Sequence, residues 1–187
     1  MVDVKEKRLR TPLSSKDVKS LNVGDIVYLS GSVYTARDKA HKRIQSFMRG
    51  GKKLPFELEG AVVYHCGPLV RKDGGSWRIV SAGPTTSARM DELAPEIIEA
   101  YGIKAVIGKG GMDENVLASL KKTCCVYLAY TGGAGALAAS RITGVEDVFW
   151  IELSTPEAVW KLRVEDFGPL VVAMDAWGGS LYNRGGR

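Results

Sequence analysis

Three hydroxyl-bearing residues stand where a helix should begin, and two basic residues follow them along the chain. Thr85, Thr86 and Ser87 precede an apolar pattern, and Arg89 and Lys109 come next in the segments ARM and GKGGM. Hydroxyls at a helix start accept hydrogen bonds from free N–H groups, and those N–H groups also favour an anion. Arginine offers a carboxylate or phosphate a planar fork, and lysine offers a point charge. The pattern therefore predicts recognition of an acidic ligand.

The same residues also allow a purely structural interpretation, which the sequence alone leaves open. Capping hydroxyls occur at most helix starts, so residues 85–87 could cap a helix while Arg89 and Lys109 lie in solvent. If the residues do form a site, Thr86, Ser87 and Gly110 are its candidate supporting residues.

The elements that must hold these residues can be read from the surrounding pattern. A short opening turn is expected from Ser87 to about Leu93, and Pro95 should restart the helix because proline is favoured at a first helical position. Gly102 should end that helix. A short strand at residues 104–107 then delivers Lys109 into a glycine-rich loop.

Another arginine precedes a second expected helix. In YTARDKAHKRI, Ala36, Ala40 and Ile44 recur at helical spacing, with Thr35 as a candidate cap and Arg37 in the first turn. Because a helix start attracts negative charge, Arg37 would lie beside a second place that favours an anion. His41, on the same helix, is more simply a packing or orienting residue than a metal ligand or base.

Composition limits the class of protein. The 187 residues are 45% apolar and 25% charged, which suits a single domain over residues 1–187. The formal charge of +5 suits an acidic substrate or partner. The basic residues at 39–53 are expected to form a solvated helix face, and RNA binding is the weaker alternative because no aromatic residues alternate with them. No long apolar run or signal peptide is visible, so a cytoplasmic protein without membrane association is expected.

Neither a complete metal site nor a nucleotide site is predicted. Cys66, Cys124 and Cys125 form an odd count without a CxxC spacing, so buried thiols are expected, the adjacent pair facing opposite ways. Zinc at His65 and Cys66 would need ligands from elsewhere. The turn at Gly132–Gly135 and the helix after it fit G-x-G-x-x-A, but no acidic partner follows at the usual distance.

The order of expected elements indicates a mixed α/β domain. Strands at 60–68 and 77–83 should form a hairpin across KDGG. A strand is expected at 145–153, a short helical segment at 155–164, and a final apolar strand at 168–177.

The two ends of the chain and one acidic residue complete these expectations. Residues 1–13 and 180–187 should be loosely ordered. Asp175 ends the final strand, where it could be functional or simply buried beside a turn.

Longer motifs connect the chain to a known family. GPTTSARM followed by IGKGGM resembles the paired signature of the C-terminal domain of class I, iron–sulfur-dependent fumarate hydratases, and of the L-tartrate dehydratase beta subunit. The segments VGDIVYLSGSVYTARDKAHKRI, YHCGPLVRKDG and FGPLVVAMDAWGGSLY are similar to the same family, so most of the chain is covered. The resemblance implies a swivelling β/β/α domain and interconversion of fumarate and L-malate. Dehydration of L-tartrate to oxaloacetate is the alternative, and a non-catalytic anion- or RNA-binding module is an alternative of another class.

The resemblance also implies roles for particular residues and a partner. Thr85 matches a threonine proposed to act in proton transfer, and Arg37, Arg89 and Lys109 match substrate-binding positions. A four-iron, four-sulfur cluster would be ligated by a partner alpha subunit, so this chain would hold no metal. A heterotetramer is implied, and the isolated chain is expected to be inactive, with a homodimer as one form it could adopt.

Overall fold

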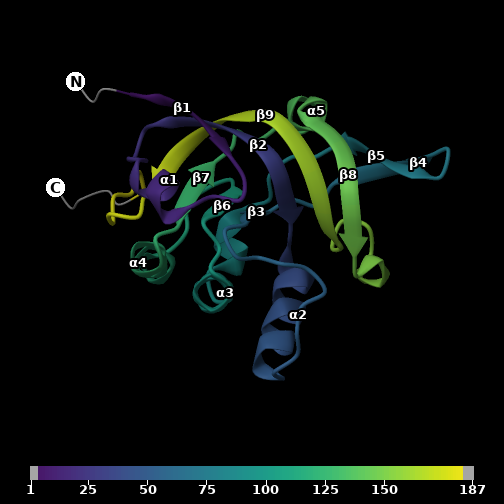
Figure 1. The fold of residues 1–187 in the computed structure, drawn as a ribbon, viewed down its shortest axis with the longest axis horizontal. Helices are drawn as coiled ribbons and strands as arrows, with labels where there is room; N and C mark the ends of the chain where they lie inside the picture. Colours follow the sequence, from purple (N-terminus) through teal and green to yellow (C-terminus); the bar gives the residue numbers. More distant parts are fainter. Residues whose placement is uncertain (1–3, 183–187) are drawn as a thin grey trace.

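The computed structural model describes residues 4–182, and its centre is a seven-stranded sheet whose strands run mostly parallel (Figure 1). The strand order is β1-β2-β3-β6-β7-β9-β8, and β2 also pairs with β9, so five strands form a closed ring. Only β9 runs antiparallel to its neighbours. The strands are β1 (Glu6–Arg10), β2 (Ile26–Thr35), β3 (Val62–Tyr64), β6 (Ala105–Gly108), β7 (Val126–Ala129), β8 (Ile142–Phe149) and β9 (Val159–Met174).

The ring is packed on both faces, which gives the domain two apolar cores. Successive residues of a strand point to opposite faces, so Val126 and Leu128 face one core while Tyr127 faces the other. Strands buried on both faces read as continuous apolar runs rather than alternating ones. Cys124 packs on the first core and Cys125 belongs to the second, which confirms that the two thiols face opposite ways.

Helices α2, α3 and α4 lie together on one side of the sheet, whereas α5 lies beside β8 and a separate hairpin (Figure 1). No helix within residues 4–182 is long and apolar enough to cross a membrane. The remaining elements are α1 (Ser15–Lys19), α2 (Asp38–Arg49), α3 (Ala94–Tyr101), α4 (Glu114–Thr123), α5 (Gly135–Ser140), the 3-10 turns η1 (Ser87–Met90) and η2 (Ile151–Leu153), and the hairpin strands β4 (Leu69–Asp73) and β5 (Ser76–Ser81).

The mixed α/β class is confirmed, and so are the elements around the signature. The 3-10 turn η1 opens the segment, and α3 follows with Pro95 in its first turn. Gly102 ends α3 in the left-handed conformation, with φ of 66°, and its N–H donates to the Ile98 carbonyl at 3.1 Å. Glycine adopts this conformation without the steric cost of a Cβ.

The predicted hairpin across KDGG is confirmed, but its first strand is misplaced, and the helical segment predicted at 155–164 is wrong over residues 159–164; both segments pair with strands that are distant in sequence. The hairpin forms between β4 and β5, whereas residues 62–64 join the main sheet between β2 and β6. Residues 159–164 are not helical but begin β9, which pairs with β2 on one side and β8 on the other. Local helix signals are overridden when a segment can pair on both edges.

The prediction that both ends of the chain are loosely ordered also needs correction. Residues 6–10 are not loose: they form β1, which pairs in parallel with residues 26–30 of β2. At the other end, Ser180 bridges to Met174, so this residue is ordered as well. The same prediction also covers residues 1–3 and 183–187, which lie outside the described residues.

Asp175 has a structural role at the end of β9. Its carboxylate is buried and accepts backbone N–H groups from Val23 at 3.1 Å, Trp177 at 2.9 Å and Gly179 at 2.8 Å. The acidic side chain thus ties the turn after α1 to the turn after β9.

Replacing Asp175 with alanine should lower the free energy of unfolding by about 3 kcal/mol, since buried N–H donors without partners are costly. Denaturant titration of the isolated chain measures this loss. Asp175→Asn is the matched control: it keeps the shape and one acceptor oxygen, so its loss should be smaller. Equal stability of the native chain and Asp175→Ala would contradict this role.

Candidate active site

The two signature segments, residues 83–90 and 107–112, are held against each other by backbone hydrogen bonds. The Ser87 N–H donates to the Lys109 carbonyl at 3.0 Å, and the Lys109 N–H donates to the Thr85 carbonyl at 3.2 Å. On its other side, the Thr85 N–H donates to the His65 carbonyl at 2.7 Å. The fold therefore places Thr85 and Lys109 next to each other, as the sequence interpretation requires.

The Ser87 hydroxyl forms a buried hub beneath these segments. It lies 2.9 Å from His65 Nδ1 and 3.0 Å from the Tyr127 hydroxyl, which also lies 3.0 Å from the Gly110 carbonyl oxygen. Gly108 leaves room for this hydroxyl, because a Cβ at that position would collide with Ser87 Oγ. The hub connects the residue after β3 with η1, β7 and the glycine-rich loop.

One arrangement of protons satisfies all members of the hub. The Gly110 carbonyl can only accept, so Tyr127 donates to it. Ser87 then donates to the Tyr127 oxygen and accepts from the Nδ1–H of His65. This leaves His65 Nε2 as an unprotonated nitrogen without a described partner, which is less costly than an unpaired buried N–H.

The two histidines are buried and neutral. Their rings meet edge to face with centroids 5.1 Å apart. Burial, and then the neighbouring His41, lower the pKa of His65 well below its ordinary value; burial likewise lowers the pKa of His41. His41 Nδ1 lies 3.0 Å from the Arg37 carbonyl oxygen. His41 therefore orients the start of α2.

Two carboxylates hold the two predicted arginines near the start of α2. Arg37 Nε lies 3.4 Å from Glu157, and Glu157 also accepts the Lys39 N–H at 2.9 Å. Arg89 forms a two-pronged pair with Asp38, Nε to Oδ1 at 3.0 Å and Nη2 to Oδ2. Because Asp38 follows Arg37 directly, the two guanidinium groups belong to one region.

Lys109 differs from the two arginines. It is exposed, and within residues 4–182 it forms no ion pair. Gly132 lies beneath it, since a Cβ there would sit 3.8 Å from Lys109 Cδ. Its charge is therefore available to an acidic ligand, whereas those of Arg37 and Arg89 are shared with carboxylates.

The alternative interpretation, that residues 85–87 only cap a helix, is wrong for two of the three hydroxyls. Thr86 directly precedes η1 but makes no side-chain capping bond, and Ser87 is committed to the buried hub. Thr35, the expected cap of α2, is instead buried and accepts the Trp160 N–H at 3.1 Å; Arg37 occupies the cap position.

The signature segments bring several predicted site residues together, but none of the four principal ones lines either of two surface cavities of the described residues. Thr85 and Arg37 are half-buried, while Thr86, Arg89, Lys109 and Gly110 are exposed. One surface cavity is lined by residues of β4, β5, α5 and β8, and the other lies near Pro12 and Lys161. The lining of neither cavity includes Arg37, Thr85, Arg89 or Lys109. A shared cavity around them stays a prediction for the assembled protein.

The described part of the chain is not built to hold a metal cluster. No group of three His, Cys, Asp or Glu side chains within residues 4–182 could bind a metal ion. The three cysteines are free, with Cys124 and Cys125 facing opposite cores, and burial raises the pKa of Cys66 to about 12 and that of Cys125 further. Thiols that stay protonated are poor metal ligands.

The glycine-rich turn after β7 has a packing reason for its glycine at 135. A Cβ there would collide with Ser81 Oγ and approach the Gly83 nitrogen to 3.3 Å. The Gly135 carbonyl also accepts the Ala82 N–H at 3.0 Å. The turn thus supports the first signature segment.

Sequence reasoning missed the residues that support the site from other elements. Tyr127, Asp38 and Glu157 form the contacts described above, yet none stands in a signature segment. Asp38 could have been found, because it follows Arg37 directly. A buried tyrosine in a strand and a glutamate before β9 carry no local signal.

Asp91, the residue after the first signature segment, has a carboxylate in an environment that disfavours its charge. Its Oδ1 is buried without a hydrogen-bond partner among the described residues. Burial, and then the neighbouring Asp113, raise its pKa to about 6. The folded state therefore binds a proton that the unfolded state releases, so this group favours folding less as the pH rises through that range.

The variant Asp91→Asn should melt at a higher temperature than the native chain at neutral pH. The advantage should shrink as the pH falls from about 6 through about 4, because the native carboxyl is protonated in both the folded and the unfolded state only below both pKa values. Thermal unfolding across this range measures it, with Glu92→Gln, an exposed neighbour, as control. A constant difference at every pH would show that Asp91 does not titrate as described.

Comparison with known proteins places the domain among the subunits of hydro-lyases. The chain belongs to the Fumarase C-terminus family, whose model matches residues 1–185. It is 50% identical over 171 residues to a Methanocaldococcus jannaschii protein named "Putative L(+)-tartrate dehydratase subunit beta", covering 91% of this chain and 88% of that one. It is 40% identical over 176 residues to the L(+)-tartrate dehydratase subunit beta of Escherichia coli, covering 94% and 86%.

A further relative is much longer than this chain and is named as a fumarate hydratase. The chain is 42% identical over 175 residues to a Geobacillus stearothermophilus protein named "Putative fumarate hydratase class I". The match covers 93% of this chain but 33% of that relative. One domain therefore occurs both in proteins named as separate beta subunits and within a longer chain.

Proposed function

We propose that this chain is the beta subunit of a two-subunit class I fumarate hydratase, which interconverts fumarate and L-malate in the cytoplasm. The observation that carries the proposal is the hydrogen-bonded pairing of the two signature segments, which brings Thr85 beside Lys109. Family membership supports hydro-lyase chemistry, and the three nearby cations suit a substrate with two carboxylates.

The charged residues are proposed to bind and orient the substrate carboxylates. Lys109 is free to pair with one of them, and Arg37 and Arg89 can donate from the guanidinium N–H groups that Glu157 and Asp38 do not occupy. When a proton leaves the carbon beside a carboxylate, negative charge builds on that carboxylate, and cations held in place stabilise it.

Thr85 is proposed to act at the proton-transfer step. An ordinary threonine hydroxyl is a very weak base, so it can act only by relaying a proton to a carboxylate of the partner or if nearby cations lower its pKa. The backbone bonds to His65 and Lys109 fix its position, as a relay requires.

The four-iron, four-sulfur cluster implied by the family does not fit the described residues of this chain. The proposal therefore assigns it to an alpha subunit, with this chain supplying cations and hydroxyls to a shared site. A hetero-oligomer is accordingly proposed as the active form, and a homodimer as a form of the isolated chain.

The proposal is tested by adding this chain to a reconstituted alpha subunit and following loss of fumarate absorbance and formation of L-malate. Neither subunit alone should turn over fumarate, and the mixture should. Fumarate turnover by the alpha subunit alone at the full rate, or none by the mixture, would contradict the proposal.

A second candidate is L-tartrate dehydratase, which the names of two well-covered relatives favour. Both substrates carry two carboxylates, so the cations described above suit either. Supplying each diacid separately to the assembled pair and comparing kcat/KM distinguishes them.

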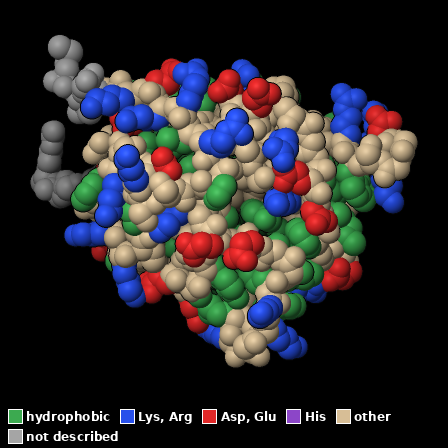
Figure 2. Space-filling view, in the orientation of Figure 1, with side chains coloured by type: hydrophobic (Ala, Val, Ile, Leu, Met, Phe, Trp, Pro, Cys, Tyr) green, Lys and Arg blue, Asp and Glu red, His purple; other side chains and the backbone are tan. Residues whose placement is uncertain are grey.

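Nucleic-acid binding is less well supported. Of the basic residues between 37 and 53, Arg37, Arg43 and Arg49 already pair with carboxylates. On the face shown in Figure 2, Lys and Arg side chains are dispersed among Asp and Glu rather than gathered in one patch. A phosphate backbone is bound best by a concentrated basic surface.

A further inference from the structure

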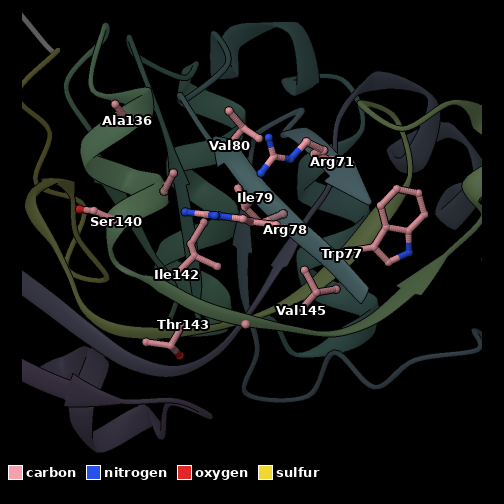
Figure 3. A pocket seen from close by; sticks show the side chains of 12 residues that line it. Arg71, Trp77, Arg78, Ile79, Val80, Ala136, Ser140, Ile142, Thr143 and Val145 are labelled. Atoms are coloured by element: carbon pink, nitrogen blue, oxygen red, sulfur yellow. The ribbon is translucent and has the colours of Figure 1, made fainter. Parts of the chain in front are cut away.

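A cleft of about 680 Å3 lies between the β4–β5 hairpin, α5 and β8. The guanidinium groups of Arg71 and Arg78 project into it from the hairpin, with Trp77 at one end and Ile142 across from them (Figure 3). The hydroxyl-bearing Ser140 also lines the cleft. None of the four predicted site residues does, so the cleft is a separate surface.

The two arginines form a like-charge pair that residues 4–182 neutralise only through one long contact of Arg71. Arg71 and Arg78 stand directly opposite each other in the hairpin register. Like charges in that position destabilise a hairpin. The Arg71 guanidinium reaches only Asp73, at 4.0 Å, and Arg78 forms no ion pair within residues 4–182. An acidic partner would turn this cost into a favourable contact.

The surroundings of the cleft favour a polypeptide over a small anion. Val80, which lines the cleft, is 46% exposed. Leu69 and Leu137, on the same hairpin and helix but outside the lining, are exposed by 61% and 46%. Strand β8 is last in the sheet order, so its outer edge pairs with no described strand. Apolar side chains and a free strand edge are the features that an extended segment of another chain covers, whereas a small anion would leave them exposed.

The cleft is separate from the candidate active site, but two of the elements that form it adjoin the first signature segment. Strand β5 ends at Ser81 and leads directly to Thr85, and α5 begins at Gly135, which packs against Gly83. Both walls of the cleft therefore meet beside the first signature segment. A chain that completes the site at Thr85 lies close enough to continue into the cleft.

We propose that this cleft binds an extended, acidic and apolar segment of the cluster-bearing partner subunit. Carboxylates of that segment pair with Arg71 and Arg78, and its apolar side chains cover Val80 and Leu137. The inference rests on the proposed function, since it concerns the same partner, but it adds which surface the partner uses.

The test compares the native chain with Arg71→Glu/Arg78→Glu in binding to the alpha subunit, by titration calorimetry at low and moderate salt. The double variant keeps a like-charge pair in the hairpin and reverses only its sign, so its folding should match that of the native chain. Its Kd should rise about 10-fold to 100-fold, as loss of two charge-assisted contacts predicts. Lys19→Glu, on α1, is the matched control and should leave the Kd within about twofold.

The single variant Arg71→Glu separates binding from folding. It places opposite charges across the hairpin, so thermal stability should rise while affinity for the partner falls. Unchanged affinity of both arginine variants, with native binding intact, would overturn the inference but leave the proposed function standing. The same variants are also titrated with inorganic phosphate. If they lost phosphate binding but kept native affinity for the alpha subunit, the cleft would be a small-anion site and the inference would be overturned. Absence of binding by the native chain would instead overturn the proposed function, and this partner with it.

Discussion

Replacing Thr85 with valine should lower kcat of the assembled enzyme by about 100-fold to 10,000-fold, the range typical for loss of a group that transfers a proton. Valine has nearly the same shape as threonine but no hydroxyl. The backbone bonds of residue 85 to His65 and Lys109 do not involve the side chain, so the loop should keep its position. KM should change little, because the substrate carboxylates are proposed to pair with Arg37, Arg89 and Lys109 rather than with Thr85.

Thr85→Ser is the matched control, since it restores the hydroxyl and should recover most of the activity. Steady-state rates with fumarate and with L-malate should fall together, because one proton moves in both directions. If Thr85→Val raised KM and left kcat unchanged, Thr85 would bind substrate rather than take part in proton transfer.

Replacing Gly108 with alanine should lower the free energy of unfolding by about 3 kcal/mol, because the added methyl group has no room. It would collide with Ser87 Oγ and lie 3.2 Å from the Tyr127 hydroxyl. Either the hub breaks, leaving buried polar groups without partners, or the two signature segments move apart. Denaturant titration measures the loss, and reconstituted turnover should fall with it.

Two further variants show whether the collision is the cause. Gly144→Ala, in β8, adds the same methyl group where no atom lies within 4 Å, and should change stability by less than about 0.5 kcal/mol. Combining Gly108→Ala with Ser87→Ala removes the obstructing hydroxyl, so the double variant should be more stable than the sum of the single losses predicts. Strict additivity would contradict this account.

The elements set by local chemistry could be predicted from the sequence. Helix α3 begins at Ala94 with Pro95 in its first turn and stops before Gly102, because proline and glycine have conformational preferences that need no distant partner. Strand β9 could not be predicted over its first residues. The segment TPEAV carries helix-start signals, and only pairing with β2 and β8 makes residues 159–164 extended.

The candidate site, too, could be predicted only where local sequence determines it. The basic and hydroxyl residues of the signature segments could be named from their types and spacing. Their environment could not, because Glu157 reaches Arg37 and Tyr127 reaches Gly110 only after distant segments have folded together. For the same reason the sequence could not show that Asp38 already occupies one edge of Arg89.

The pairing of β2 with β9 has a consequence for how the protein is made. Residues 26–34 pair with residues 161–171, so the ring of strands cannot close until residue 171 has left the ribosome. Contacts between segments so far apart slow folding, and the nascent chain keeps unpaired strand edges exposed meanwhile. Co-synthesis with a chaperone or with the partner should therefore raise the yield of native protein more than a longer refolding time does.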